Sequence, residues 1–156
     1  MRVGIGYDVH PLVAGRALVL GGVLIPHTSG LDGYSDADVL THAVIDALLG
    51  AAGLGDIGRL FPAGEPKYAG AASLEMLAVT VKAVGDAGYR IVNVDCTVIA
   101  QEPRLQPYLT KMESNLAEQV GAAGVNVKGK SPEGLGVLGH GGGIAAQAVA
   151  TIEELA

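Results

Sequence analysis

Asp8 and His10 stand two residues apart in an apolar, β-branched segment at the start of the chain. If this segment is a strand, both side chains leave the same face, with their Cα atoms roughly 6.5–7 Å apart. A carboxylate oxygen and an imidazole nitrogen at that separation can converge on one cation. A third protein ligand would leave a fourth position open, which is the usual arrangement of a catalytic zinc site.

His42 lies on the first predicted helix, which we expect to start at Ser35 as N-cap, with Asp38 completing a capping box, and to end near Gly50. It is either a further ligand or a polar residue on a half-exposed face. Asp46, one turn later, either orients the His42 ring or lies on a solvated face. The Ser35 hydroxyl can cap the helix and also contact an anion at the helix N-terminus.

The elements that must position these residues interleave without a strict βαβ repeat, so the predicted fold class is α+β. Predicted strands cover residues 2–10, 89–100 and 125–128, with a turn at 13–16 before an apolar run at 17–25. Predicted helices cover about 35–50, 73–87 and a segment with Pro107 in its first turn. Residues 53–66 are expected to form a loop with a short helical turn. The tail from Ile144 suits either a helix or a strand.

The bulk composition narrows the class of protein. The 156 residues predict one domain, 1–156, and their 49% hydrophobic content favours an oligomer. A net charge of −6 argues against a nucleic-acid partner. No apolar run is long enough to span a membrane, and the N-terminus lacks a signal-peptide pattern. The single cysteine, Cys96, is typical of a cytoplasmic protein.

Two glycine-containing segments allow more than one interpretation. Residues 124–131 match the phosphate-binding expression G-x-x-x-x-G-K-[ST], but they alternate like a strand and Pro132 follows, so we reject a P-loop. Residues 134–143 contain six glycines and are either a flexible connector or backbone that approaches a ligand or another subunit closely. The turn at 102–104 is expected to form a ligand rim.

A series of motifs along the chain is similar to one known family. Gly-Tyr-Asp-Val-His at 6–10, Gly-Gly-Val-x-Ile-Pro at 21–26 and Ser-Asp-x-Asp-Val at 35–39 come first. His-Ala-x-x-Asp-Ala-Leu-Leu-Gly-Ala-Ala, Gly-Leu-Gly-Asp-Ile-Gly-x-Leu-Phe-Pro and Asn-Val-Asp-x-Thr-Val-Ile-Ala-Gln-x-Pro-Arg follow in order. Together they resemble the 2-C-methyl-D-erythritol 2,4-cyclodiphosphate synthases from Arg2 to about Ile152.

The resemblance implies a mixed sheet packed against helices on one side, with a strand as the last segment. It implies a homotrimer around a central, sheet-lined axis, with active sites shared between neighbours. The implied activity is that of a phosphorus–oxygen lyase of the non-mevalonate isoprenoid pathway. It converts 4-diphosphocytidyl-2-C-methyl-D-erythritol 2-phosphate into the cyclic diphosphate and CMP.

The resemblance also assigns residues to roles. Asp8, His10 and His42 would bind one zinc ion per subunit, and a second divalent cation, magnesium or manganese, would join the substrate diphosphate near Glu133. Tyr34 and Ser131 are the implied catalytic residues, and Ser35 and Ser131 would donate to phosphate oxygens. The erythritol part would contact Asp56, Ile57, Gly58, Phe61, Pro62, Ala63, Gly64 and Glu65, and Val9 is a further implied substrate contact. The remaining substrate contacts would come from Ala100, Gln101, Glu102, Pro103, Arg104, Leu105, Gln106, Lys130, Pro132, Val137 and His140, of which 100–106 form the cytosine pocket.

Several positions depart from the family pattern. Tyr34 replaces a histidine, the loop 61–65 has lost a carboxylate at Ala63, and Lys130 with Ser131 replaces a pair of threonines. Near the implied trimer axis, Val137, His140 and Gly142 replace Phe, Arg and Glu, so an isoprenoid diphosphate site there is not inherited. Two alternatives follow: a weakened or redirected homologue that binds cytidine nucleotides with little turnover, and a non-catalytic trimeric scaffold with a structural metal.

Overall fold

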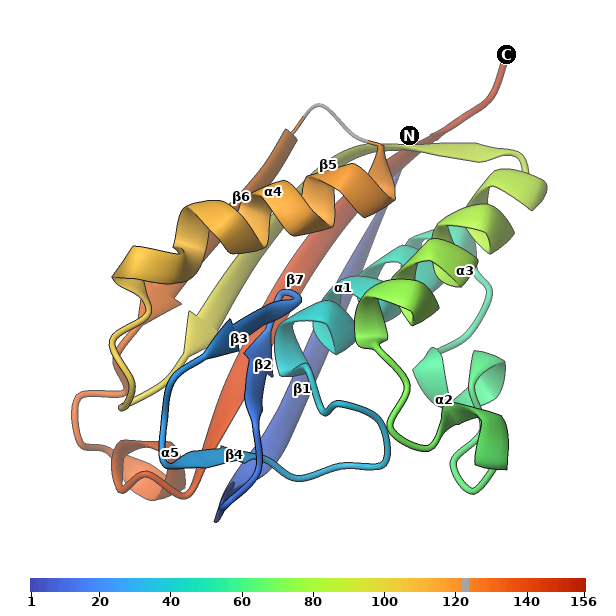
Figure 1. Cartoon of the computed structure of the whole chain (residues 1–156). Helices are drawn as coiled ribbons and strands as arrows, with labels where there is room; N and C mark the ends of the chain where they lie inside the picture. The colour runs from blue at the N-terminus through green and yellow to red at the C-terminus, as the bar shows by residue number, and fades with distance from the viewer. Residues whose placement is uncertain (122–123) are drawn as a thin grey trace.

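The computed structural model of the chain describes residues 1–121 and 124–156. Its main sheet has five strands in the order β4-β1-β7-β5-β6, with helices over one face (Figure 1). The strands are β1 (Arg2–Ala14), β4 (Ser29–Leu31), β5 (Tyr89–Ile99), β6 (Gly124–Lys130) and β7 (Gly143–Glu154). β5 and β6 pair in parallel, and the other neighbours pair antiparallel. The predicted α+β class, with a mixed sheet covered on one side, is confirmed.

Three long helices cover the sheet: α1 (Val39–Ala52), α3 (Ser73–Asp86) and α4 (Leu109–Val120). α1 packs on β1 and β7, α4 packs on β6, and α3 lies against α1 and α4. The short elements are a separate hairpin of β2 (Leu18–Leu20) and β3 (Val23–Ile25), then α2 (Ile57–Leu60), η1 (Pro66–Tyr68), η2 (Gln106–Tyr108) and α5 (Gly136–Gly139).

Two glycines bring β1 directly onto the backbone of α1. A Cβ atom at Gly4 would lie 2.0 Å from the Ala47 carbonyl oxygen, and one at Gly6 would lie 1.9 Å from that of Ala43. Any side chain at either position would push the strand off the helix. This close approach sets the position of the middle of β1, which carries Asp8 and His10, relative to His42 on α1.

The predicted start of α1 is wrong, because Asp38 and not Ser35 is the N-cap. Ala37 has a φ of 57°, a left-handed conformation that a helix starting at Ser35 cannot contain. The buried Asp38 carboxylate accepts from the Thr41 N–H at 3.0 Å and from the N–H groups of Gly21 and Gly22 at 2.9 and 2.8 Å. The Asp38 carboxylate therefore joins the start of α1 to the β2–β3 turn. No local sequence pattern reveals this connection.

Other boundaries also differ from those predicted. β1 extends to Ala14, because residues 12–14 pair with β4, so the predicted turn at 13–16 is confirmed only for residues 15 and 16. Pro107 lies in η2, and α4 begins two residues later. Residues 124–130 form β6, which confirms that they are no P-loop, and the tail is the strand β7 as the resemblance implied. The helix 73–87 and the strand 89–100 are confirmed to within one residue at their ends.

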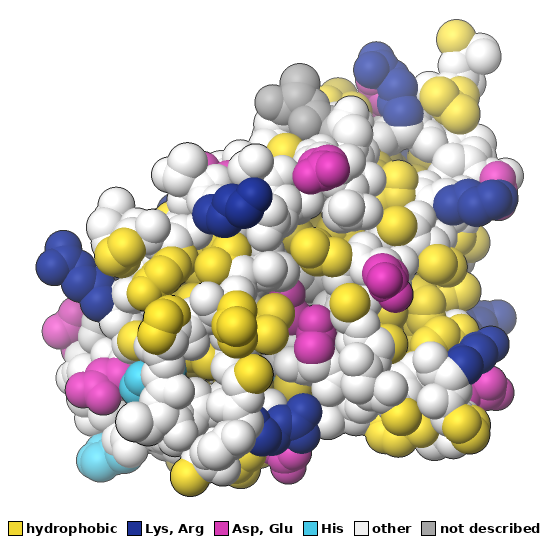
Figure 2. Space-filling view, viewed as in Figure 1, with side chains coloured by type: hydrophobic (Ala, Val, Ile, Leu, Met, Phe, Trp, Pro, Cys, Tyr) yellow, Lys and Arg dark blue, Asp and Glu magenta, His cyan; other side chains and the backbone are white. Residues whose placement is uncertain are grey.

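The face of the sheet turned away from the helices carries exposed apolar side chains. Val3, Ile5, Tyr7 and Val9 alternate along β1 with exposures of 65%, 71%, 52% and 46%, and Val149 on β7 is next to them. On the opposite, helix-bearing side, Lys and Arg side chains are spread singly among acidic ones (Figure 2). Among the described residues, no helix is both long and apolar enough to cross a membrane.

Candidate active site

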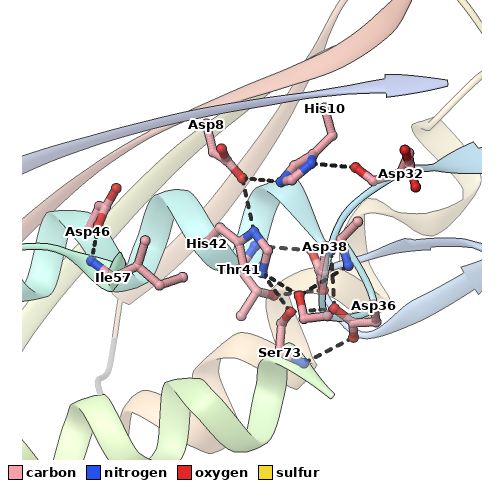
Figure 3. Close-up of polar contacts among 12 residues, drawn as sticks. Asp8, His10, Asp32, Asp36, Asp38, Thr41, His42, Asp46, Ile57 and Ser73 are labelled. Carbon is pink, nitrogen blue, oxygen red and sulfur yellow. Dashed lines mark hydrogen bonds and ion pairs between the residues drawn. The ribbon is translucent and has the colours of Figure 1, made fainter. Parts of the chain in front are cut away.

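Asp8, His10 and His42 meet where the middle of β1 passes the first turn of α1 (Figure 3). Asp8 Oδ2 lies 3.0 Å from His10 Nε2 and 3.0 Å from His42 Nδ1. One ligand atom from each residue fits within 4.8 Å of the others, and His42 is buried. Because one carboxylate oxygen and two imidazole nitrogens converge here, the donor set fits a divalent transition metal such as zinc.

The His10 ring is held by the backbone. Its Nδ1 lies 2.6 Å from the Asp32 carbonyl oxygen, which can only accept a hydrogen bond. Nδ1 therefore carries a proton, so Nε2, the nitrogen that faces Asp8, is the one available to bind a cation. An imidazole anchored in this way is oriented as metal-binding histidines usually are.

The His42 ring is held at its other nitrogen by two hydroxyls. Nε2 lies 3.1 Å from Ser35 Oγ and 2.9 Å from Ser73 Oγ. The Ser35 oxygen also accepts from the Ala37 N–H at 3.3 Å. His42 thus comes from α1, Ser73 from the first residue of α3 and Ser35 from the loop between β4 and α1.

The electrostatics of the group favour an ionised carboxylate. Burial raises the pKa of Asp8, but the hydrogen bonds and charges of His10 and His42 outweigh it and lower this pKa from 3.8 to about 2. The same hydrogen bond to Asp8 raises the pKa of His10 from 6.5, against the effect of burial. A metal cation would replace the protons that lie between Asp8 and the two histidine rings. The Asp8 carboxylate is already ionised, so it needs no deprotonation to bind the cation.

A small hollow of about 140 Å³ opens beside the three residues. It brings together six residues predicted from the sequence: His10, Tyr34, Ser35, His42, Phe61 and Ala63. The Tyr34 hydroxyl donates to the Glu65 carbonyl oxygen at 3.0 Å, and the Tyr34 carbonyl oxygen accepts from the Gly70 N–H at 2.9 Å. Tyr34 therefore ties the loop after Phe61 to the start of α1.

Other predicted substrate-binding residues do not line this hollow. Pro62, Gly64 and Glu65 are on the same loop, and Asp56, Ile57 and Gly58 begin α2, where the Asp56 side chain accepts from the Arg59 N–H. The Val9 side chain points to the opposite sheet face from Asp8 and His10. Asp46 does not orient the His42 ring: its half-buried carboxylate accepts from the Ile57 N–H at 2.7 Å (Figure 3) and does not contact the ring.

A larger hollow of about 660 Å³ lies at the ends of β5 and β6. All seven residues of the predicted cytosine pocket, 100–106, line it together with Lys130 and Ser131. The Ser131 oxygen accepts from the Glu133 N–H at 3.0 Å, and the Gln101 side chain accepts from the Gly134 N–H at 2.9 Å. These contacts hold the turn that carries Pro132 and Glu133 at the rim of the hollow.

The glycine-rich segment 134–143 makes close approaches within this chain. A Cβ at Gly139 would lie 2.2 Å from the Gly134 backbone, and one at Gly143 would lie 2.5 Å from the His10 carbonyl oxygen. His140 lines a third hollow of about 450 Å³, and Val137 is 74% exposed. These glycines therefore allow the segment to fold closely onto the chain's own backbone, and an approach to a ligand or another subunit stays a prediction.

Sequence reasoning missed three residues of these sites. Ser73 and Asp36 lie behind His42, and His27 lines both the 660 and the 450 Å³ hollows. His27 directly follows the Gly-Gly-Val-x-Ile-Pro motif, which was the available signal. Ser73 is 31 residues from His42, so no spacing rule could pair them.

Comparison with known proteins gives the family. The profile of the YgbB family matches residues 1–153. The 2-C-methyl-D-erythritol 2,4-cyclodiphosphate synthase of Bordetella petrii is 58% identical over 153 residues, covering 97% of this chain and 94% of that protein. The synthase of Agathobacter rectalis is 54% identical over 157 residues, covering 99% and 89%.

Solved structures share the fold at lower identity. The bifunctional IspDF of Campylobacter jejuni matches with a TM-score of 0.94 and 39% identity, covering 99% of this chain and 42% of that longer protein. A CDP-bound 2C-methyl-D-erythritol-2,4-cyclodiphosphate synthase matches with a TM-score of 0.89 and 33% identity, covering 97% and 100%. Because the family profile matches nearly the whole chain and the relatives are more than half identical to it, the chain belongs to the YgbB family, alongside the 2-C-methyl-D-erythritol 2,4-cyclodiphosphate synthases.

Proposed function

We propose that this protein is a cyclodiphosphate synthase, acting as a phosphorus–oxygen lyase on 4-diphosphocytidyl-2-C-methyl-D-erythritol 2-phosphate. The observation that carries the proposal is the convergence of Asp8, His10 and His42 in a chain of this family. An oxygen of the substrate's 2-phosphate forms a bond to the β-phosphorus, the bond from that phosphorus to the bridging oxygen breaks, and CMP leaves. The attacking phosphate is already anionic at neutral pH, so the chain needs no general base.

The three residues would hold one zinc ion per subunit. Zinc bound there would supply Lewis-acid stabilisation of the charge that develops at the β-phosphate. The chain itself folds and holds the substrate, which contributes by orientation. The Ser35 hydroxyl borders the 140 Å³ hollow and is suited to donate to a phosphate oxygen.

The 660 Å³ hollow is the proposed site of the cytidine, with residues 100–106 reading the base and Lys130 and Ser131 contacting phosphate oxygens. A synthase that shares this fold binds CDP, which supports the assignment. Glu133 is one exposed carboxylate on the rim. A second divalent cation, magnesium or manganese, would therefore be held mostly by the substrate's own phosphates.

The protein is further proposed to act as a homotrimer with shared sites, in the cytoplasm. The 140 and 660 Å³ hollows have no lining residue in common. One substrate would bridge them most simply if a neighbouring subunit supplied the cytidine hollow. The exposed apolar side chains on β1 are the surface that such a neighbour would cover.

The proposal is tested by incubating the purified protein with the diphosphocytidyl substrate and following phosphorus NMR signals. We expect the cyclic diphosphate and CMP in equal amounts, loss of both with a chelator, and recovery when Zn²⁺ and Mg²⁺ are restored. Cytidine binding without CMP release would instead identify a redirected homologue. Turnover that survives complete metal removal would contradict the proposed role of the triad.

A further inference from the structure

Behind His42 lies a hydrogen-bonded pair, the buried Ser73 and the half-buried Asp36, that the proposed function leaves unexplained (Figure 3). Ser73 is fully buried, and its hydroxyl donates to the Asp36 carboxylate while its oxygen lies 2.9 Å from His42 Nε2. Asp36 also accepts from the backbone N–H groups of Ser73 at 3.0 Å and Asp38 at 3.1 Å. The carboxylate is therefore fixed by the backbone that precedes α1 and by the start of α3.

The hydrogen-bond directions determine which nitrogen of His42 carries a proton. A carboxylate can only accept, so the single hydroxyl proton of Ser73 goes to Asp36. Toward His42, Ser73 then offers only lone pairs, and Nε2 must donate. The nitrogen left to bind a cation is Nδ1, which is the one that lies 3.0 Å from Asp8 Oδ2.

We infer that Asp36 and Ser73 are positioning residues that fix the His42 ring so that Nδ1, and not Nε2, faces the cation. The inference rests on the proposed metal site. It concerns the orientation of one ligand of that site and adds no further ligand. In both histidines one ring nitrogen is held by the protein and the other faces the cation, but the nitrogen that faces the cation differs between them. His10 is held by the Asp32 backbone carbonyl and presents Nε2, whereas His42 is held through Ser73 and presents Nδ1.

A purely structural role makes a different prediction. Ser73 begins α3, and Asp36 lies before α1, so the pair also joins two helix starts. If joining them were its whole purpose, removing the pair would lower thermal stability and leave metal affinity unchanged. Metal affinity and the state of the His42 ring therefore decide between the two roles.

The test compares Ser73→Ala and Asp36→Asn with the wild type, His42→Ala and the matched control Asp46→Asn. Asp46→Asn removes the same charge one turn from His42, but this carboxylate contacts the Ile57 N–H and not the ring. Zn²⁺ affinity is measured by competition with a chromophoric chelator. We expect about 10–100-fold weaker binding for Ser73→Ala and Asp36→Asn, and a much smaller change for Asp46→Asn.

A second readout follows the ring itself in the zinc-loaded wild type. Nitrogen-15 NMR should show a metal-bound Nδ1 and a slowly exchanging proton on Nε2 of His42, and this proton should exchange faster in Asp36→Asn. Ligation through Nε2 would overturn the inference even if Ser73→Ala failed to fold.

The affinities also separate this inference from the proposed metal site. Wild-type affinity in both Ser73→Ala and Asp36→Asn, with binding lost in His42→Ala, would overturn the positioning role alone. Unchanged affinity in His42→Ala would overturn the metal site and the inference with it.

Discussion

At the scale of single residues, each candidate metal ligand is oriented by a different part of the chain. A backbone carbonyl orients His10, a buried serine contacts His42, and the two rings in turn flank Asp8. Such surroundings fix ring orientation before any ion arrives, which lowers the entropy lost on binding. The departures from the family pattern all lie outside these three residues, for example at Tyr34, Ala63 and Lys130.

Tyr34 is predicted to hold the substrate loop in place. Its hydroxyl donates to the Glu65 carbonyl oxygen, so Tyr34→Phe should free the loop at one point. A lost neutral hydrogen bond is worth about 1 kcal/mol, and we expect KM to rise about five-fold with a smaller change in kcat. Steady-state kinetics and faster amide exchange at residues 64–70 would check this.

A matched control for this variant is Tyr89→Phe. It also removes one phenol hydroxyl with a hydrogen bond, here from Arg2, at the other end of β1 from the metal site. Kinetics of Tyr89→Phe should match those of the wild type. Equal kinetics for Tyr34→Phe and the wild type would show that the loop does not depend on the Tyr34 hydroxyl.

Cys96 is predicted to be unreactive in the folded protein. Burial, helped by the charge of Asp95, raises the pKa of its thiol from 9.0 to about 12. A raised pKa means that the folded thiol stays protonated where the unfolded one ionises, so stability should fall as the pH rises from about 9 to about 12. Alkylation by iodoacetamide at pH 8.5 should be negligible until denaturant is added. Rapid labelling of the native chain would contradict the burial of Cys96.

At the scale of elements, the contact of β1 with α1 depends on glycine residues in β1, which have no side chain to separate the two backbones. Gly6→Ala would place a Cβ 1.9 Å from the Ala43 carbonyl oxygen, and we expect a loss of about 2 kcal/mol or more in the free energy of unfolding. The metal affinity should fall too, because the strand that carries Asp8 and His10 must shift. Urea unfolding and zinc titration measure the two effects.

Gly85→Ala is the matched control for Gly6→Ala, because it makes the same substitution at a glycine with free space around it. Gly85 is exposed in α3, and a Cβ there would have no neighbour within 4 Å. Alanine should therefore stabilise the helix by about 0.5–1 kcal/mol and leave zinc binding unchanged. If both variants behaved alike, the close approach of β1 to α1 would not be the cause.

The comparison of predicted and observed elements shows where local sequence carries the information. The strand 89–99 alternates strongly and was predicted almost to the residue. The start of α1 was not, because the Asp38 carboxylate that caps it at the Thr41 N–H is also held by the N–H groups of Gly21 and Gly22, which lie 17 and 16 residues away. Likewise, β1 extends to Ala14 since β4 returns to pair with it. Partners distant in sequence decided both outcomes.

The residues of the candidate site also differ in how far local sequence could predict them. Asp8 and His10 could be paired from their spacing on a strand, whereas His42 needed the family resemblance. Asp46 has the helical spacing of a residue that could orient His42, yet the backbone of α2 engages it. Ser73 and Asp36 contact each other across 37 residues, and only the folded chain brings them together behind the ring.

At the scale of the whole molecule, the open sheet face predicts association. Ile5 is 71% exposed in a row with Val3, Tyr7 and Val9, which is a large apolar surface for a free monomer. Ile5→Asp would place a charge in that row without touching the helix side of β1. We expect light scattering to give a trimer for the wild type and a monomer for Ile5→Asp, with circular dichroism unchanged. A monomeric wild type would contradict the proposed assembly.

Shared active sites can be tested by mixing two inactive variants. His42→Ala would remove the metal from one hollow, and Lys130→Glu would place a negative charge in the other, where the anionic substrate is proposed to bind. If each site joins hollows of two neighbouring subunits, randomly mixed trimers contain sites in which both halves are intact. Activity should then recover to about a quarter of the wild-type value after unfolding and refolding an equal mixture. Each variant refolded alone should stay inactive. No recovery in verified mixed trimers would place both hollows of a site in one subunit, and the substrate would have to span them within a single chain.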